Sequence, residues 1–369
     1  MAPELLTHAP LVLATFAVAA GLVAAFVPRV RDFAHRIGAV QGGGGQHGNG
    51  TRVHRGSLPN IGGLAIFAGF LVAVLVGSIV APQAVAAYRV ELLAIVLGGT
   101  LMMLVGLIDD LYEVSPALRL ATQVAAAGIL VVNGITIDFV TNYFGPTPFL
   151  FVPQTFAVLL TVLWVVGFVN AFNFIDGLDG LSSGIAAIAS LSLLAVALQF
   201  PDRGVSVLLL AAVAGSALGF LRHNSNPATI HMGDSGAYFL GFLLAAVSVL
   251  GALKVTAAVT VVAPILVLAL PVVNITQVTL RRLRRGHDPT LAANDHLHDL
   301  LRVRSGSPRV AVYTLWAAAL ACGVLGMLVS ATPVWLVMTT IVGSVALLVG
   351  VTWLRWREVQ RTEALQQGA

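Results

Sequence analysis

Amide and carboxylate side chains are concentrated in the segment VNAFNFIDGLDGL, residues 169–181. Asn170 and Asn173 are one helical turn apart, and Asp176 and Asp179 repeat that spacing. One aspartate would be enough to cap the next helix, so capping does not account for all four residues. Their oxygens are hard ligands, which suit Mg²⁺ and the phosphates it binds. The segment therefore predicts a polar site for a metal ion and a phosphate-containing ligand.

A second acidic group lies in the segment LVGLIDDLYEVSP, residues 104–116. Helical spacing places Asp109 and Glu113 on one face, and the neighbouring carboxylates of Asp109 and Asp110 repel each other unless a cation lies nearby. Another acid, Asp234, comes directly before a later apolar segment. Each of these acids could simply cap an apolar helix. Ionisable residues at membrane depth are costly and usually functional, however, which favours a role in chemistry.

Histidines and acids also occur together in the predicted loop 281–309. His296 and His298, with Asp295 and Asp299, first suggest a zinc site. The i,i+2 spacing of the histidines does not suit one helix face, as an H-x-x-x-H pattern would. Because arginines surround them, the pattern favours donors of charge-assisted hydrogen bonds to a diphosphate.

The first polar loop contains a glycine run, QGGGGQHGNG, at residues 41–50. A phosphate-binding loop of the Walker type would end in GK[ST] before a helix, and this run does not. We therefore interpret residues 41–50 as a flexible insertion. Arg52, His54 and Arg55 follow it, and they are either solvated charges or part of the same site.

The composition shows what kind of elements must position these residues. The chain has 369 residues, of which 58% are apolar and only 10% charged, and its mean hydropathy is +0.93. A water-soluble domain carries about 25% charged residues, so this is an integral membrane protein. The single Cys322 excludes an internal disulfide. The apolar stretch 11–27 lacks a preceding basic segment and a convincing cleavage site, so we expect it to be a retained span.

Apolar segments long enough to cross a bilayer recur along the whole chain, with about 20 residues needed for each. We expect one all-α polytopic membrane domain over residues 1–369, with about 11 transmembrane helices. The predicted spans are 10–28, 60–80, 91–108, 118–137, 153–171, 181–199, 205–221, 235–252, 255–279, 309–330 and 334–354. The stretch 138–152 combines turn residues with aromatics and predicts a short hairpin or an interfacial loop.

The basic residues predict the orientation of the chain. Alternating the loops around eleven spans places 17 arginines on one side and three basic residues on the other, which accounts for all 20 lysines and arginines. Basic loops remain in the cytoplasm, so the N-terminus is expected outside and the C-terminus inside. The net charge of +4 then reflects topology, and no nucleic-acid partner is expected. The acids named above all fall on the cytoplasmic side, which predicts one active site built from cytoplasmic loops.

Hard oxygen ligands beside arginine and histidine donors, with no Walker lysine, indicate Mg²⁺-assisted phosphoryl chemistry at the membrane surface. The chain resembles the polyprenyl-phosphate N-acetylhexosamine-1-phosphate transferase family. The resemblance lies in five motifs in order: RVHRGSLPNIGG (52–63), DDLYE (109–113), NAFNFIDGLDGL (170–181), NPATIHMGDSGA (226–237) and HLHD (296–299). It implies transfer of a sugar 1-phosphate from a UDP-sugar to a polyprenyl phosphate, with release of UMP. It also implies a multi-pass protein of the bacterial inner (plasma) membrane and a homodimer.

The resemblance implies roles for individual residues. Asp234, Asn173 and Asp110 would hold Mg²⁺, or Mn²⁺ in its place. Asp109 or Asp110 would accept the proton of the lipid phosphate, unless one of them acts as a covalent nucleophile. The residues implied to contact the substrates are Asn170, Asp176, Asp179, His296, His298, Arg302, Arg52 and His54.

Several positions depart from the family pattern. Asp299 stands where the family has a third histidine, Ala293-Asn294 replaces an Asp-Arg or Asp-Lys pair, and His231 replaces Phe or Leu before the MGD triplet. VHRGSLPNIGG and HLHD favour an N-acetylglucosamine substrate over the phospho-MurNAc-pentapeptide alternative. A secondary transporter is a further alternative, but transporters place such groups at the bilayer midplane and show two similar halves. A structural scaffold would leave the clustered acids unexplained.

Overall fold

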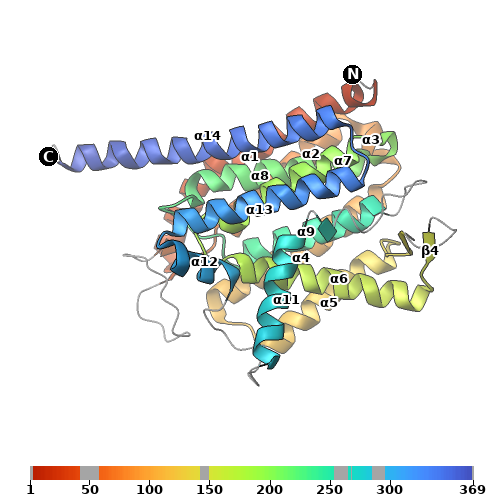
Figure 1. The fold of residues 1–369 in the computed structure, drawn as a ribbon, viewed down its shortest axis with the longest axis horizontal. Helices are drawn as coiled ribbons and strands as arrows, with labels where there is room; N and C mark the ends of the chain where they lie inside the picture. The colour runs from red at the N-terminus through yellow and green to blue at the C-terminus, as the bar shows by residue number, and fades with distance from the viewer. Residues whose placement is uncertain are drawn as a thin grey trace.

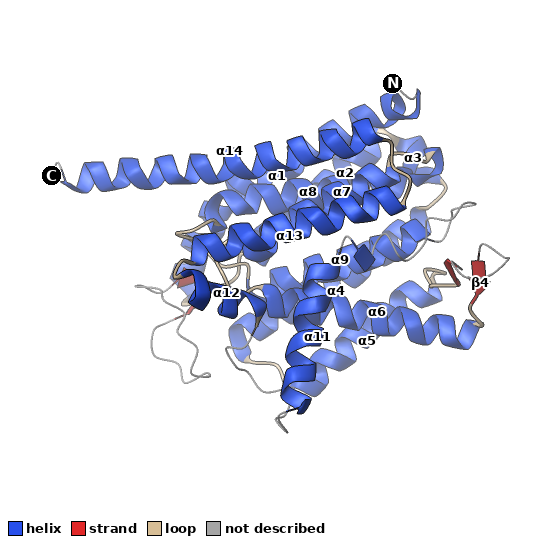
Figure 2. Ribbon diagram, viewed as in Figure 1, coloured by secondary structure: helices blue, strands red, loops and turns tan. Residues whose placement is uncertain are grey.

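The computed structural model describes residues 3–41, 58–141, 149–252, 265–266, 268–284 and 296–367. Helices dominate these residues, and the strands form only two short pairs (Figure 2). The helices pack into one bundle, and α14 extends past the end of the bundle at its C-terminus (Figure 1). The predicted glycine-rich insertion at 41–50, with Arg52 and His54, lies outside the described residues.

Eight helices in the described part of the chain are long and apolar enough to span a membrane. They are α1 (Pro3–Ile37), α2 (Gly63–Val80), α4 (Arg89–Tyr112), α6 (Gln154–Ile175), α8 (Gly204–Asn224), α9 (Gly233–Ala252), α13 (Pro308–Val329) and α14 (Val334–Gln367). Two shorter apolar helices, α5 (Pro116–Val132) and α7 (Leu181–Ala197), coincide with two more predicted spans. The all-α polytopic membrane class is thus confirmed.

The count of eleven spans and the orientation remain predictions. The ninth predicted span, 255–279, lies partly outside the described residues, and the structure shows only its second half, within α11 (Ala269–Arg284). The remaining short helices in the described part of the chain are α3 (Pro82–Ala86), the 3₁₀ turn η1 (Pro201–Arg203) and α12 (Leu297–Ser305).

Helix α8 lies at the centre of the bundle and is buried along its whole apolar length. Its main partners are α1, α2, α7, α9 and α14. Small residues make this packing close: a Cβ at Gly215 or Gly219 would collide with the α1 backbone oxygens of Phe16 and Ala20. Helices that meet through small residues gain van der Waals contact between backbones, which is a main source of helix association in membranes.

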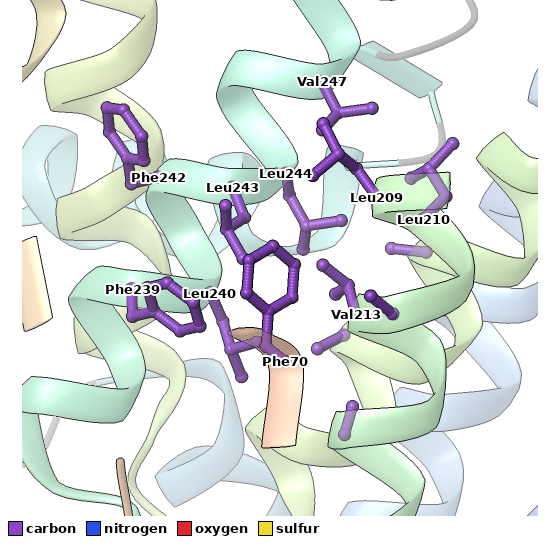
Figure 3. Close-up of a cluster of buried hydrophobic side chains, with 14 of the residues drawn as sticks. Phe70, Leu209, Leu210, Val213, Phe239, Leu240, Phe242, Leu243, Leu244 and Val247 are labelled. Atoms are coloured by element: carbon purple, nitrogen blue, oxygen red, sulfur yellow. The ribbon is translucent and has the colours of Figure 1, made fainter. Parts of the chain in front are cut away.

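Aromatic and branched side chains fill the space between α2, α8 and α9 (Figure 3). The ring of Phe239 on α9 meets the rings of Phe67 and Phe70 on α2 edge to face, at centroid distances of 5.3 and 5.2 Å. Such edge contacts add about 0.5–1.5 kcal/mol each beyond the burial of area. This packing fixes α9, whose first turn carries Asp234.

Two small antiparallel pairs of strands lie outside the helical bundle. β1 (Val40–Gln41) pairs with β2 (Leu58–Pro59), which leads into α2. β3 (Phe139–Thr141) pairs with β4 (Phe149–Phe151), so of the two alternatives for 138–152, a short hairpin or an interfacial loop, the structure shows the paired strands of a hairpin. Figure 1 shows this hairpin at the opposite end of the bundle from α12.

Candidate active site

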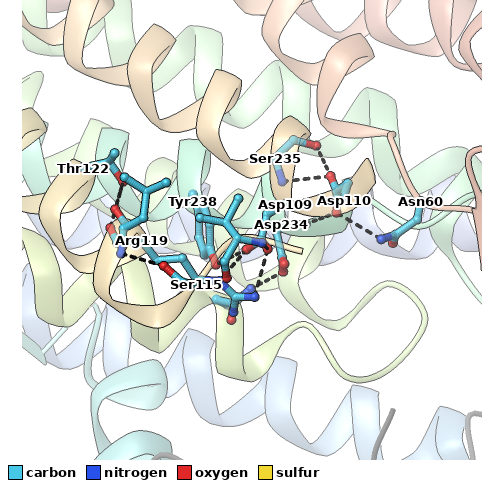
Figure 4. A network of polar contacts seen from close by, with 12 residues as sticks. Asn60, Asp109, Asp110, Ser115, Arg119, Thr122, Asp234, Ser235 and Tyr238 are labelled. Carbon is cyan, nitrogen blue, oxygen red and sulfur yellow. Dashed lines mark hydrogen bonds and ion pairs between the residues drawn. The ribbon is translucent and has the colours of Figure 1, made fainter. Parts of the chain in front are cut away.

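Asp110 at the end of α4 caps the first turn of α9 (Figure 4). Its carboxylate accepts hydrogen bonds from the backbone nitrogens of Asp234 at 2.7 Å and Ser235 at 3.1 Å, and from Ser235 Oγ at 2.7 Å. Asn60 Nδ2, just before α2, donates a fourth at 3.0 Å. The first backbone N–H groups of a helix have no partner within that helix, and a carboxylate satisfies them well. Asp110 thus joins α4, α9 and the entrance of α2.

Asp109 points to a different side of α4, because neighbouring helical residues diverge by about 100°. Arg119 on α5 holds it by two contacts of 2.8 Å, from Nη2 to Oδ1 and from Nε to Oδ2. Tyr238 on α9 donates its hydroxyl to Oδ2 at 3.0 Å, and the backbone nitrogen of Val114 donates to Oδ1 at 2.8 Å. The Asp109 carboxylate is only 1% exposed, so Arg119 is its main electrostatic partner.

We predict that Arg119→Met destabilises the protein by about 3 kcal/mol. A buried carboxylate that loses its partner costs about 3–5 kcal/mol, and Arg119 is 35% exposed, which favours the lower end. Thermal unfolding in detergent measures this loss. Arg222→Met is the matched control, because the Arg222–Glu358 pair is about 40% exposed on both sides and should contribute under 1 kcal/mol. The double variant Arg119→Met/Asp109→Asn should regain part of the stability lost in Arg119→Met. If it does not, loss of the ion pair is not the cause of the destabilisation.

Asp234 is the third acid of this cluster. It lies beside the other two carboxylates, and its Oδ1 accepts a hydrogen bond from Asn173 Nδ2 on α6. Asp109, Asp110 and Asp234 thus meet from helices that are far apart in the sequence, with Arg119 as the neighbouring guanidinium. Among the residues that the structure describes, these three carboxylates meet one guanidinium, which favours an additional cation.

The donor set fits Mg²⁺ held mainly by Asp234. Within the described ranges, no three histidine, cysteine or acidic side chains are arranged to enclose a metal ion. Mg²⁺ does not require such a cage, because it keeps several waters and binds through one or two carboxylates together with substrate phosphates. Asp109 and Asp110 are already engaged by the donors described above. Asp234, whose contact with Asn173 uses Oδ1, is the acid best placed to meet a metal ion.

The predicted polar segment after α6 folds into a turn between α6 and α7. Asp176 accepts a hydrogen bond from Ser182 Oγ at 2.6 Å. Asp179 accepts from Asn226 Nδ2 at 3.0 Å and from the backbone nitrogen of Ala228 at 3.1 Å. Asp179 therefore ties this turn to the loop that leads to Asp234.

Asn170 lies deeper on α6 than this turn and donates to Gln123 Oε1 on α5 at 2.7 Å. The structure thus places Asn173 at the acid cluster, Asp176 and Asp179 in the adjoining turn, and Asn170 at the contact between α5 and α6.

His296 and His298 stack on each other at the start of α12, with ring centroids 5.4 Å apart. His296 also stacks on Phe174 of α6 at 5.5 Å. A Cβ at Gly177 would collide with the ring of His298, so the histidine pair lies directly against the turn after α6. Asn274 on α11 holds the start of α12 by accepting from the backbone nitrogen of Leu297 at 2.9 Å. This arrangement brings the predicted histidines to the edge of the site.

Burial lowers the pKa of His298 to about 4, although Asp299 opposes the shift. His298 Nδ1 has no hydrogen-bond partner among the described residues. Arg302 lies 3.6 Å from Asp299 on the same helix. At neutral pH the imidazole of His298 is therefore uncharged, and its 3.6 Å contact with Asp299 is not an ion pair.

We predict that His298 makes the protein less stable as the pH falls from about 6.5 to about 4. In this window the unfolded chain, with a histidine pKa near 6.5, binds a proton that the folded chain does not, so stability rises with pH. The slope is at most roughly 1.4 kcal/mol per pH unit. Comparing unfolding midpoints of the wild type and His298→Gln at pH 7 and pH 5 isolates this contribution. If the difference between the midpoints of the wild type and His298→Gln is the same at pH 7 and pH 5, this prediction is wrong.

Four contact residues of the cluster were not predicted as site residues: Asn60, Arg119, Ser235 and Tyr238. Two of them carried a usable signal. Arg119 is a charge inside the predicted span 118–137, and Tyr238 lies one helical turn after Asp234 on the same face of α9. Asn60 and Ser235 carried none, because only the packing of α4 against α9 brings them to Asp110.

Comparison with known proteins identifies the family. Residues 92–252 match the model of glycosyl transferase family 4. The chain is 31% identical over 331 residues, covering 88% of this chain and 87% of the relative, to a Bacillus subtilis protein named probable undecaprenyl-phosphate N-acetylglucosaminyl 1-phosphate transferase. It is 30% identical to the decaprenyl-phosphate N-acetylglucosaminephosphotransferase of Mycolicibacterium smegmatis, covering 82% and 80% of the two chains. It is 26% identical to the undecaprenyl-phosphate alpha-N-acetylglucosaminyl 1-phosphate transferase of Yersinia pestis, covering 85% and 84%.

The matched region contains α4, α6 and α9, which supply the three carboxylates and Asn173. The relatives extend the similarity over most of the remaining chain. The chain therefore belongs to glycosyl transferase family 4.

Proposed function

We propose that this protein transfers N-acetylglucosamine 1-phosphate from UDP-N-acetylglucosamine to a polyprenyl phosphate and releases UMP. The observation that carries the proposal is the meeting of Asp109, Asp110 and Asp234 from α4 and α9 in a chain whose relatives are named for this transfer. We further propose that the site faces the cytoplasm of a bacterial plasma membrane. The excess of arginines in the loops on that side supports this orientation.

In the proposed reaction, an oxygen of the lipid phosphate attacks the β-phosphorus of the UDP-sugar. The bond from that phosphorus to the bridging oxygen breaks, and UMP leaves with the bridging oxygen. Mg²⁺, held by Asp234 with Asn173 beside it, would neutralise charge on the diphosphate. Asp110 fixes the position of Asp234 by holding the first turn of α9.

We assign proton acceptance to Asp109 rather than Asp110. Asp110 accepts four hydrogen bonds that hold α9 and Asn60 in place. Asp109 is held by Arg119, and substrate phosphates would attract that guanidinium and free the carboxylate. We propose that His296 and His298, which lie beside the turn after α6, and Arg302 of α12 contact the diphosphate or the sugar.

The test is direct assay of the purified protein. It is incubated with undecaprenyl or decaprenyl phosphate, Mg²⁺ and each of several UDP-sugars, and UMP is measured. We expect release of UMP with UDP-N-acetylglucosamine, and loss of release on chelation of the metal. UMP release with only UDP-MurNAc-pentapeptide would overturn the sugar assignment, and no release with any UDP-sugar would overturn the reaction.

A further inference from the structure

A cavity of about 310 Å³ lies between α13, α14 and the loop that follows α8. Four aromatic side chains line it: Tyr313 and Trp316 on α13, and Trp353 and Trp356 on α14. Arg309, in the first turn of α13, and Asn226, in the loop, complete the side nearest the active site. The reaction proposed above uses none of these six residues.

The lengths of the two helices place this cavity at the level of lipid headgroups. About 20 residues of helix cross the hydrocarbon core. A stretch of this length that begins at Val334, the start of α14, ends near Trp353. A stretch of this length that runs back from Val329, the end of α13, ends near Arg309. Tryptophan and tyrosine are enriched at this depth in membrane proteins because their rings are amphipathic.

An exposed apolar stripe on α14 leads into the cavity. Val342, Val345 and Val349 are 66%, 45% and 59% exposed, and they follow one another at helical spacing toward Trp353 and Trp356. Residues three and four positions apart share one helix face, so the five side chains form a continuous surface. In a membrane this surface faces acyl chains, and an acyl chain that followed it would bring its headgroup to the cavity.

The cavity also offers a cationic group. Arg309 donates from Nε to Asn226 Oδ1 at 2.9 Å, and its terminal nitrogens have no hydrogen-bond partner among the described residues. Asp179 also lines the cavity, and its carboxylate accepts hydrogen bonds from Asn226 and the backbone nitrogen of Ala228. Glu363 lines the cavity further along α14, beyond Trp356. A phosphate oxygen would be well placed on the guanidinium of Arg309.

We propose that this cavity binds the headgroup of an anionic membrane phospholipid. The phosphate contacts Arg309, the aromatic side chains surround the glycerol region, and one acyl chain follows the stripe of Val342, Val345 and Val349. The bound lipid differs from the reacting lipid phosphate, which belongs at Asp234. Through Asn226 and Asp179, the occupied site supports the loop that leads to Asp234.

Quenching of tryptophan fluorescence by brominated lipids tests the proposal. Three of the five tryptophans, Trp316, Trp353 and Trp356, line the cavity. The full chain is placed in phosphatidylcholine nanodiscs with a small fraction of either phosphatidylglycerol or phosphatidylcholine brominated in the acyl chain. We expect brominated phosphatidylglycerol to quench the tryptophan fluorescence at an approximately tenfold lower lipid fraction than brominated phosphatidylcholine does. A tenfold difference is the effect of one charge-assisted hydrogen bond.

Two variants and a control make the test specific. Arg309→Gln should lose the preference for phosphatidylglycerol, and Thr352→Phe should lose it by filling the cavity while leaving Arg309 in place. Arg361→Gln removes an equal charge from α14 outside the cavity lining and should keep the preference. Equal quenching by the two lipids in the wild type would overturn the proposal. An equal loss of the preference for phosphatidylglycerol in Arg309→Gln and Arg361→Gln would also overturn it. Displacement of the brominated phosphatidylglycerol by stoichiometric polyprenyl phosphate would also overturn it. The readout requires no catalysis, so it is independent of the proposed reaction.

Discussion

Asp234→Asn should reduce UMP release by about 10³-fold, the loss typical when a main electrostatic group is removed from an active site. The amide keeps the shape of the side chain, and the backbone nitrogen of residue 234 still donates to Asp110. The fold of α9 should therefore survive while the negative charge available to a metal ion is lost. The measurement is the initial rate of UMP release at saturating Mg²⁺, with membrane insertion and thermal midpoint compared in parallel.

Asp138→Asn is the matched control for this variant. Asp138 is an exposed carboxylate before β3, where it accepts a hydrogen bond from Thr136. It should retain full activity, because it lies outside the acid cluster. Near wild-type release by Asp234→Asn would show that Asp234 neither binds the metal ion nor contacts the reacting phosphates.

Gly233→Ala should both destabilise the protein and strongly reduce activity. Gly233 has φ +71°, which disfavours any residue with a Cβ. A Cβ there would also collide with the backbone oxygen of Asn60 and lie 2.5 Å from Asp110 Oδ2. Backbone strain and overpacking each cost about 1–3 kcal/mol, so we expect a loss of about 2–6 kcal/mol. Because the substitution displaces the first turn of α9, UMP release should fall roughly 100-fold.

Gly128→Ala provides the comparison for Gly233→Ala. Gly128 lies inside α5, and a Cβ there meets no atom within 4 Å. Alanine is favoured over glycine within a helix by about 1 kcal/mol, so this variant should be as stable as the wild type or slightly more so. Equal unfolding midpoints for the two variants would show that the capped turn at Asp110 tolerates a side chain.

The sequence predicted the helices well because membrane spans are set by long apolar segments, a signal that does not depend on tertiary contacts. It was less exact where a helix ends. Glu113 was expected on the same helical face as Asp109, but α4 ends at Tyr112 and Glu113 has φ +51°. The N-terminal Ser115 cap and Pro116 of the next helix redirect the chain there, so the two acids do not share a helical face.

The sequence indicated the polar segments where acids gather, but it did not indicate which group each acid contacts. Asp109 and Asp110 are adjacent in sequence and carry the same chemistry, yet one binds Arg119 and the other caps α9. Asp179 accepts hydrogen bonds from Asn226 and Ala228 in the following loop, and its contact with the substrate stays a prediction. Such differences depend on the rotation of each helix about its axis and on which neighbour it meets. Residue types and spacing within one segment do not contain that information.

The burial of α8 has a consequence for how the protein is assembled in the bilayer. Three of its neighbours, α1, α2 and α7, precede it in the chain, whereas α9 and α14 follow it. When α8 leaves the translocon, the surfaces that these later helices will cover must face lipid. A helix with apolar residues on every side can remain there at little cost until α14 has been synthesised and encloses it.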